Sequence, residues 1–436
     1  MAFYLSFSSS ATERVLRGFW VKRLLEGRRV HESSGKARVI EALQKPAPYG
    51  PDIDLGRYEF EEARVEGDPS VLSESGLERA AMRVGMDSSS PSYIQLNQMA
   101  IYRAIHRALE KYNVTIMPLR EALEKLEVAR ELSWKLIKPE TDKYTAHAYL
   151  YGGELGYFIY VPPRTKVPLP IYSCLAITVE KRVQFAHNVI YVGEGSEAHV
   201  VTGCSVPHGV SEGVHIGISE FYVGRNAKLT FSMVHAWARG LHVRPRTAAR
   251  LESGGEFVNY YVLYSPVGSI QAYPRAVLEE NAKTYMASII AGSESGVYDL
   301  GSMAVLEGRG SSAEIVSRVV ARDSCKIYAR AEIRGEAPKS KGHIECLGLL
   351  LSNDSMISSI PIITSTTLES RISHEAAIGM IAQEELEYLM CKGFTEEEAK
   401  AILVRGFMSV EAPGIPSRVK VEMDKILDMV SRQAIG

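Results

Sequence analysis

Two patterns of hydrophobic and polar residues divide the chain. Up to about residue 140, apolar residues recur at helical spacing and predict amphipathic helices over 11–28, 93–112 and 118–136. Between the first two lies a proline- and glycine-rich stretch, 45–54, which predicts a loop. After about Thr145, β-branched and aromatic residues alternate with polar ones in short runs, the pattern of strands. From about Glu375 a helical pattern returns, and Thr395 with Glu398 forms a capping box that predicts a helix start.

The turn residues of the strand region recur at a nearly constant spacing. They stand at positions 195, 226, 254, 281 and 310, which differ in turn by 31, 28, 27 and 29. A repeat of roughly this length built of strands alone indicates a solenoid, because one coil cannot bury its apolar face without stacked neighbours. The pattern favours a parallel β-helix. A β-sandwich is the alternative, although sandwich strands recur at about 8 to 12 residues without a longer period.

Composition narrows the class of protein. The chain has 436 residues, of which 46% are hydrophobic and 23% charged, as in globular proteins of roughly two to three domains. The formal net charge of -2 gives no overall positive field, so we expect no nucleic-acid partner. Apolar runs such as 347–351 are far shorter than the roughly 20 residues of a membrane helix. Residues 1–10 lack a basic start and a long apolar run, which argues against secretion.

Five cysteines are spread along the chain, an odd number without any CxxC pair: Cys174, Cys204, Cys325, Cys346 and Cys391. Neither a disulfide framework nor a zinc ribbon fits them, so we expect a reducing cytoplasm and, by default, buried thiols. Cys346 precedes His374 by one period of the repeat. If successive coils stack, this thiol and this imidazole are brought near each other.

Three short motifs do not support enzymatic chemistry. Residues 308–313 match a loose dinucleotide fingerprint, but a strand pattern follows them where a phosphate-binding loop must open a helix. The sequence around Lys36 lacks the upstream glycine and the hydroxyl of a P-loop, so we expect no ATP hydrolysis by this chain. His374 and Glu375 begin like a zinc-protease helix, but no second histidine follows four residues later.

Two long C-terminal motifs closely resemble the signature of the SufB/SufD family, and shorter ones support the resemblance over most of the chain. The long motifs are Ser373-His374-Glu375-Ala376-Ala377-Ile378-Gly379-Met380-Ile381 and Gly393-Phe394-Thr395-Glu396-Glu397-Glu398-Ala399. The shorter ones are Leu136-Ile137-Lys138-Pro139, Gly156-Tyr157-Phe158-Ile159-Tyr160-Val161-Pro162, Gly203-Cys204-Ser205-Val206-Pro207 and Lys45-Pro46-Ala47-Pro48-Tyr49-Gly50-Pro51-Asp52.

The resemblance implies a scaffold for iron–sulfur cluster assembly rather than an enzyme. Its fold would be a right-handed parallel β-helix over 141–372 between helical domains over 1–140 and 373–436. SufB pairs with SufD, or a single such chain pairs with itself, and each C-terminal domain docks a SufC-type ABC ATPase, which agrees with the missing P-loop. A cysteine desulfurase system supplies sulfur. The docking helix would carry Thr395, Ala399, Ile402, Leu403 and Phe407.

Site residues follow from the same resemblance. Cys346 matches the cluster-assembly cysteine of SufB, His374 the interface histidine, and Glu375 the glutamate after it. Cys204 matches the sulfur-accepting cysteine. His235 and Trp237 match a glutamine and a tryptophan that line the route between the two sulfurs. The implied mechanism brings two copies of Cys346 and His374 together across a dimer interface, which opens when SufC binds ATP.

Departures from SufB keep the alternatives open. Ser373 replaces a glutamate, Ala176 and Thr178 replace an arginine and an asparagine, and an N-terminal cysteine cluster is missing. A SufD-like structural partner without sulfur chemistry is therefore one alternative, and a β-helix carbohydrate-active enzyme is another. The nascent iron–sulfur cluster is the expected cargo. The sequence leaves open the cluster type, the use of a flavin, and the choice between homodimer and heterodimer.

Overall fold

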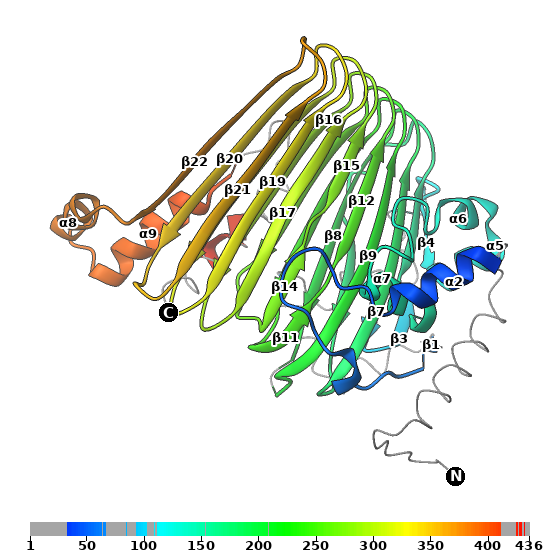
Figure 1. Ribbon diagram of the computed structural model, residues 1–436, viewed down its shortest axis with the longest axis horizontal. Helices are drawn as coiled ribbons and strands as arrows, with labels where there is room; N and C mark the ends of the chain where they lie inside the picture. The colour runs from blue at the N-terminus through cyan, green and yellow to red at the C-terminus, as the bar shows by residue number, and fades with distance from the viewer. Residues whose placement is uncertain are drawn as a thin grey trace.

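The fold was analysed in a computed structural model that describes residues 33–62, 64–66, 84, 93–102, 109, 111–152, 154–207, 209–410, 424–425, 427–429 and 431. The predicted helix over 11–28 lies outside these residues. Within them the chain forms a solenoid of about 8 turns, built mostly of parallel strands, with helices towards both termini (Figure 1). The β-helix favoured by the sequence is confirmed, and the β-sandwich is not observed.

Two long sheets face each other across the solenoid interior. Sheet A consists of β4 (Thr115–Pro118), β5 (Tyr157–Val161), β7 (Arg182–Val192), β9 (Glu212–Val223), β11 (Gly240–Val243), β12 (Arg246–Leu251), β14 (Ser269–Ala272), β15 (Arg275–Leu278), β17 (Val297–Leu306), β19 (Lys326–Gly335) and β21 (Met356–Ser365). Sheet B consists of β1 (Arg64–Glu66), β3 (Met99–Tyr102), β2 (Tyr93–Leu96), β6 (Ile171–Ala176), β8 (Glu197–Ser205), β10 (Lys228–Ala236), β13 (Glu256–Leu263), β16 (Lys283–Gly292), β18 (Ser312–Ala321), β20 (Lys341–Leu350) and β22 (Arg371–Met380).

The register of sheet B reproduces the repeat seen in the sequence. Glu197 pairs with Lys228, Lys228 with Glu256, Glu256 with Lys283, and Lys283 with Ser312. The numbers of these partners differ in turn by 31, 28, 27 and 29, the same series as the turn positions. The turn residues, Gly195, Asn226, Gly254, Asn281 and Gly310, all have positive φ, between 52° and 70°. Glycine and asparagine tolerate this left-handed conformation, which explains their recurrence.

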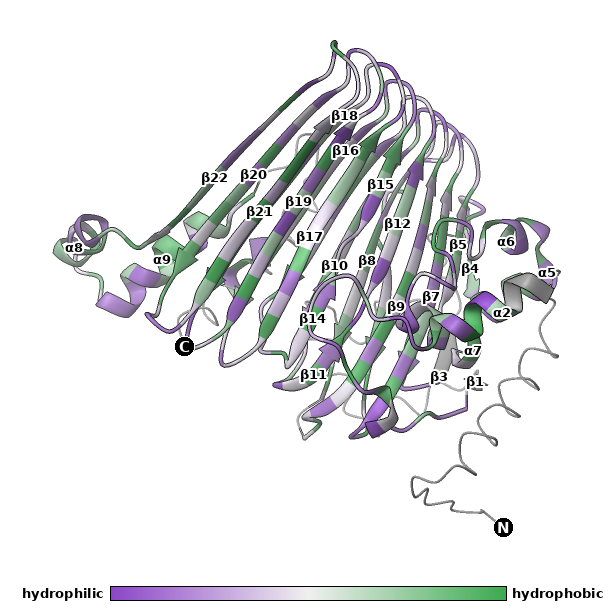
Figure 2. Cartoon of the chain, viewed as in Figure 1, coloured by the Kyte–Doolittle hydropathy of each residue, from purple (hydrophilic) through white to green (hydrophobic). Residues whose placement is uncertain are grey.

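Alternation along each strand separates the interior from the outer faces. The largest buried cluster is apolar and comes from both sheets, with Leu229, Phe257, Leu278 and Ile315 among its members. In Figure 2 hydrophobic and hydrophilic residues alternate along the strands, as expected when successive side chains point to opposite faces.

Helices lie at the two ends of the solenoid (Figure 1). They are α2 (Ser33–Ala42), the 3-10 helix η1 (Leu55–Arg57), α5 (Leu119–Lys125), α6 (Glu127–Leu132), α7 (Lys143–Tyr151), α8 (Gln383–Cys391) and α9 (Glu396–Met408). Buried residues of α7, such as Tyr144, pack on the outer face of sheet A. Val404 and Met408 of α9 pack on the outer face of sheet B. None of the described helices is long and apolar enough to cross a membrane.

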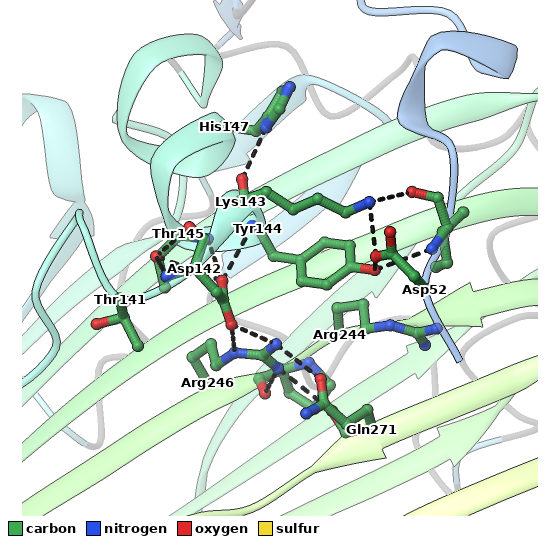
Figure 3. Close-up of polar contacts among 12 residues, drawn as sticks. Asp52, Thr141, Asp142, Lys143, Tyr144, Thr145, His147, Arg244, Arg246 and Gln271 are labelled. Atoms are coloured by element: carbon green, nitrogen blue, oxygen red, sulfur yellow. Dashed lines mark hydrogen bonds and ion pairs between the residues drawn. The ribbon is translucent and has the colours of Figure 1, made fainter. Parts of the chain in front are cut away.

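The predicted loop 45–54 forms a strap across the outer face of sheet A, drawn in dark blue in Figure 1. The Gly50 amide donates to Oδ2 of Asp299 on β17 at 3.0 Å. Beside the strap, Asp142 caps α7 and accepts two hydrogen bonds from the guanidinium of Arg246, at 2.8 and 2.7 Å (Figure 3). Nζ of Lys143 lies 2.6 Å from Oδ1 of Asp52. These contacts fasten the N-terminal elements to the solenoid.

Three local predictions are wrong. The segment 93–112 does not begin as a helix, because β2 and β3 form a hairpin whose turn includes Asn97 at φ 50°. The segment 118–136 forms two short helices, because the backbone is extended at Leu126. The C-terminal helices begin at Gln383 rather than near Glu375, because β22 continues to Met380. The division into three domains stays a prediction, and β22 crosses the expected boundary at 372.

Candidate functional site

Cys204 lies in the solenoid interior on β8. Its side chain is fully buried and belongs to the apolar cluster that fills the space between the sheets. The thiol donates to the sulfur of Met233 across 3.6 Å. On the next strand of the ladder, β10, its direct partner is His235. The sequence-predicted pair Cys204 and His235 is therefore brought together.

A cluster of buried rings surrounds His235. Its ring centroid lies 5.5 Å from that of Trp237, and the Trp237 ring lies 5.1 Å from that of His215. Nδ1 of His235 is 3.0 Å from the Tyr261 hydroxyl, and Nδ1 of His215 is 2.9 Å from Oε1 of Gln184. Within the described part of the chain, Nε2 of His235 has no hydrogen-bond partner. His215 and Tyr261 were not predicted as site residues.

Burial holds these groups in their neutral forms. It raises the pKa of the Cys204 thiol well above its usual range, and Cys174 adds to this effect. Burial also lowers the pKa of His235 well below its usual range and that of His215 to about 3. The pKa of Tyr261 is raised, first by burial and then by Cys204. Near neutral pH this closed state therefore presents a thiol rather than the nucleophilic thiolate.

One row of inward-facing positions connects the coil of Cys204 to that of Cys346. The register places them opposite one another on successive strands, and they are Thr202, Met233, Tyr261, Ser288, Ser317 and Cys346. Cys204 joins this row through its contact with Met233. Five strand spacings separate β8 from β20, which amounts to about 24 Å. Sequence analysis did not identify the residues of the row that lie between the two thiols. They could have been found by counting one repeat length at a time from a chosen starting residue.

Cys346 lies near the C-terminal end of this row. Its side chain is 2% exposed. Burial raises its pKa, while the hydroxyls of Ser359 and Ser317 and the charge of Arg318 oppose that rise. Ser317 precedes it in the row, and Ser359 lies on β21 of the facing sheet. The thiol thus lies beside two serine hydroxyls within the apolar interior cluster.

His374 lies on β22 and faces the same interior, but it is not the ladder partner of Cys346. It pairs with Ile344, whereas Cys346 pairs with Ala376. In the last coil, ladder partners such as Lys341 and Arg371 are 30 residues apart, whereas Cys346 and His374 are 28 residues apart. His374 therefore lies two residues before the position that pairs with Cys346. One strand spacing and two residues put the two Cα atoms about 8 Å apart. His374 is exposed because β22 is the last strand of sheet B.

Glu375 is separated from these two residues. It follows His374 on β22, so its side chain points to the outer face of sheet B. Its ladder partner there is Glu345, which contacts Arg318. Among the described residues, no group of three or more His, Cys, Asp and Glu side chains is arranged to hold a metal ion.

The predicted docking helix is α9. Its capping box is confirmed: Thr395 Oγ1 accepts from the Glu398 amide at 3.2 Å, and the Glu398 carboxylate accepts from the Thr395 amide at 2.8 Å. Ala399 is buried, Leu403 and Phe407 are half-buried, and Ile402 is exposed. Phe407 packs with the cluster on the outer face of sheet B. Part of the predicted docking stripe is therefore core.

A second apolar set on α8 and the following turn is exposed and was missed by sequence reasoning. Tyr388, Met390 and Phe394 are 62%, 43% and 41% exposed. Figure 1 shows α8 at the end of the solenoid that carries β22. The sequence of the short α8 did not single out this set. Whether its side chains are exposed depends on which surfaces the solenoid leaves uncovered.

Comparisons with known proteins agree with this architecture. A family model described as SUF system FeS cluster assembly, SufBD core domain, matches residues 175–407. An iron–sulfur cluster assembly SufBD family protein from Methanothermobacter thermautotrophicus is 41% identical over 399 residues, covering 89% of this chain and 96% of the relative. A protein of the same description from Archaeoglobus fulgidus is 38% identical over 382 residues, covering 87% and 100%. One from Staphylococcus epidermidis is 26% identical over 404 residues, covering 88% and 85%.

Proposed function

The chain belongs to the SufBD family of iron–sulfur cluster assembly proteins, and we propose that it is a scaffold subunit that accepts sulfur and iron and builds a nascent cluster. In this proposal Cys204 accepts sulfur, and Cys346 with His374 ligates the growing cluster. The family assignment does not favour the carbohydrate-active alternative. ATP hydrolysis belongs to a SufC-type partner.

The observation that carries the proposal is the interior row between the two thiols. Cys204 contacts Met233, and the row from Met233 reaches Cys346 through Tyr261, Ser288 and Ser317. A thiolate both binds iron and attacks sulfane sulfur. Attack by Cys204 on a donor persulfide forms the new sulfur–sulfur bond and releases the donor as a thiolate. His235 and Trp237 line the interior beside the acceptor.

Both thiols are covered and protonated in the closed state, so sulfur transfer requires an opening motion. ATP binding by the SufC-type partner supplies the free energy for it in our proposal. The exposed Ile402 of α9 and the exposed Tyr388, Met390 and Phe394 provide the docking surface. Thr395 caps the helix, Phe407 packs with the cluster on the outer face of sheet B, and Ala399 and Leu403 are buried and half-buried. A cysteine desulfurase system is the sulfur donor. Five free cysteines in the described structure are consistent with a cytoplasmic setting.

A dimer completes the ligand set. β21 and β22 are the last strands of their sheets, and their exposed apolar residues include Ile363, Ile378 and Met380. Apolar side chains at an open sheet end are a surface for a partner. A second copy of this chain, or a paralogue, would bring a further thiol and imidazole to Cys346 and His374, which supply too few ligands alone.

The test is anaerobic reconstitution with ferrous iron, a cysteine desulfurase and the SufC-type ATPase. We expect Cys346→Ala and His374→Ala to lower the iron and sulfide bound per dimer, together with the visible absorption of the cluster. Cys325→Ala is the matched control, because Cys325 is also buried but lies outside the row. Wild-type cluster content in Cys346→Ala would overturn the assignment.

The alternative is a SufD-like structural partner without sulfur chemistry. Mass spectrometry of the chain after incubation with desulfurase, cysteine and the ATPase distinguishes the two. A persulfide on Cys204 supports the scaffold. A chain that supports cluster formation by a paralogue while Cys204 stays unmodified supports the structural role.

A further inference from the structure

A groove of about 530 Å³ lies on the outer face of sheet B, at the starts of β10, β13, β16, β18 and β20. It is separate from the solenoid interior, because its floor is formed by outward-facing Val258 and Tyr285. Its volume is in the range of small-molecule sites. The proposed sulfur chemistry does not use it.

The first outward position of each coil forms one wall of the groove. In ladder order these positions are Lys228, Glu256, Lys283, Ser312 and Lys341, and Arg371 continues the row on β22 beyond the groove. Glu256 lies 3.9 Å from Lys228 and 4.0 Å from Lys283, so one carboxylate is shared by two ammonium groups and these three residues keep a net positive charge. Beyond Lys283 no acidic residue occupies this row. Among the described residues, no ion pair involves Lys341, which lines the groove, so this part of the wall is positive.

The spacing of this positive part suits a phosphoryl group. Ser312 lies between Lys283 and Lys341, one strand spacing, about 4.8 Å, from each. An anion above the Ser312 hydroxyl is therefore within reach of both lysine side chains at once. Lysine binds phosphate as a flexible point charge, so the two ammonium groups need no fixed geometry to converge on it.

The second outward position supplies polar groups deeper in the groove. The row runs through Val258, Tyr285, Glu314 and His343. Tyr285 is only 7% exposed and lines the groove. Burial raises its pKa, followed by the effects of Tyr260 and Glu314, so the hydroxyl remains a donor. The Glu314 carboxylate beside it accepts hydrogen bonds and disfavours a second anionic group there.

We propose that this groove binds a phosphorylated small molecule, with the phosphoryl group over Ser312 between Lys283 and Lys341 and a hydroxyl-bearing or amine-bearing part held by Tyr285 and Glu314. The first outward row contacts the phosphoryl group, and the second outward row contacts the rest of the ligand. A ligand with anionic groups at both ends would meet Glu314, whereas a sugar phosphate offers hydroxyl donors to it.

Isothermal titration of the full chain in 150 mM salt with ribose 5-phosphate and with pyrophosphate tests the proposal. We expect ribose 5-phosphate to bind with a Kd below about 1 mM. Lys283→Gln with Lys341→Gln should weaken it at least tenfold. Glu314→Gln should weaken ribose 5-phosphate but not pyrophosphate, because only the sugar donates to the carboxylate.

Lys326→Gln is the matched control, since Lys326 is an exposed lysine at the start of β19 in sheet A. It should leave both affinities unchanged. The proposal is overturned if neither ligand binds at concentrations up to about 10 mM. It is also overturned if the double variant binds ribose 5-phosphate as tightly as the Lys326→Gln control does. Circular dichroism confirms that each variant is folded. None of these results depends on whether Cys204 carries sulfur.

Discussion

The Cys204 thiol and the Met233 thioether lie 3.6 Å apart inside the solenoid, with the thiol as donor. The proposed sulfur acceptor is therefore buried, and reagents in solution do not reach it in this state. We predict that a maleimide labels one cysteine per native chain, Cys391, because it is exposed and the other four cysteines are buried. Peptide mass spectrometry locates the label. Cys391→Ser should remove it, and urea should expose all remaining thiols. Rapid native labelling of Cys204 would contradict the closed interior.

The second prediction concerns the ion pair between Arg246 and Asp142, called here the clamp. Arg246→Met leaves the almost fully buried Asp142 carboxylate without its guanidinium partner. Removing one member of such a pair costs about 3 kcal/mol of unfolding free energy. Urea denaturation measures this loss, and limited proteolysis should show earlier cleavage in the strap 45–54. Arg275→Met, at an exposed position of β15, is the control and should change stability by less than about 0.5 kcal/mol. Equal stability of the two variants would show that the clamp is not needed.

The buried histidines predict a loss of stability in acid. An unfolded histidine takes up its proton near pH 6.5, whereas burial lowers the pKa of folded His215 to about 3. Its contribution is therefore complete above about pH 6.5 and decreases as the pH falls, by about 1.4 kcal/mol per pH unit. His215→Gln removes this dependence. Between pH 7.5 and 5 the variant should lose about 2 kcal/mol less than the wild type does.

Denaturation curves at the two pH values measure that difference. Lys326→Gln, at an exposed position of β19, is the comparison variant. It should lose the same stability as the wild type over this pH range. An unchanged pH dependence in His215→Gln would mean that His215 titrates in the folded chain as it does in the unfolded one.

The open end of the solenoid predicts the effect of a charge at Ile378. This residue faces the interior of the last coil, yet it is 42% exposed because no further strand covers it. Ile378→Lys should place an ammonium group in the proposed interface and halve the mass measured by light scattering. Ile40→Lys, at a position 43% exposed on α2, should leave the mass unchanged. A wild-type mass for Ile378→Lys would contradict pairing through this end.

The solenoid could be predicted from the sequence because its period is set locally. Positive φ at Asn226 and Gly254 requires residues that tolerate it, so glycine or asparagine recurs at the turns and reveals the period. The hairpin of β2 and β3 has no such recurring residue. Tyr93 and Ile94 are both buried, one in the interior cluster and the other in the outer cluster of sheet B. A strand buried on both faces lacks alternation and can be mistaken for a helix.

The roles of the site residues stay predictions, and the sequence located some of their relative positions better than others. The separation between Cys204 and His235 equals the local coil length, and they are direct partners. The separation between Cys346 and His374 is two residues shorter than their coil, so they are offset. Coil lengths vary between 27 and 31 residues, so the register of β22 is needed to place His374.

The solenoid has different ends, and this limits what assemblies it can form. At the N-terminal end the parallel stacking stops, because β2 pairs with β3 and β4 pairs with β5 in antiparallel fashion. At the other end β21 and β22 finish the stack in the part of the chain that the structure describes. If two copies pair through β21 and β22, as proposed above, both use the same end of the solenoid, so the pairing closes on itself and growth into a fibre stops at two subunits.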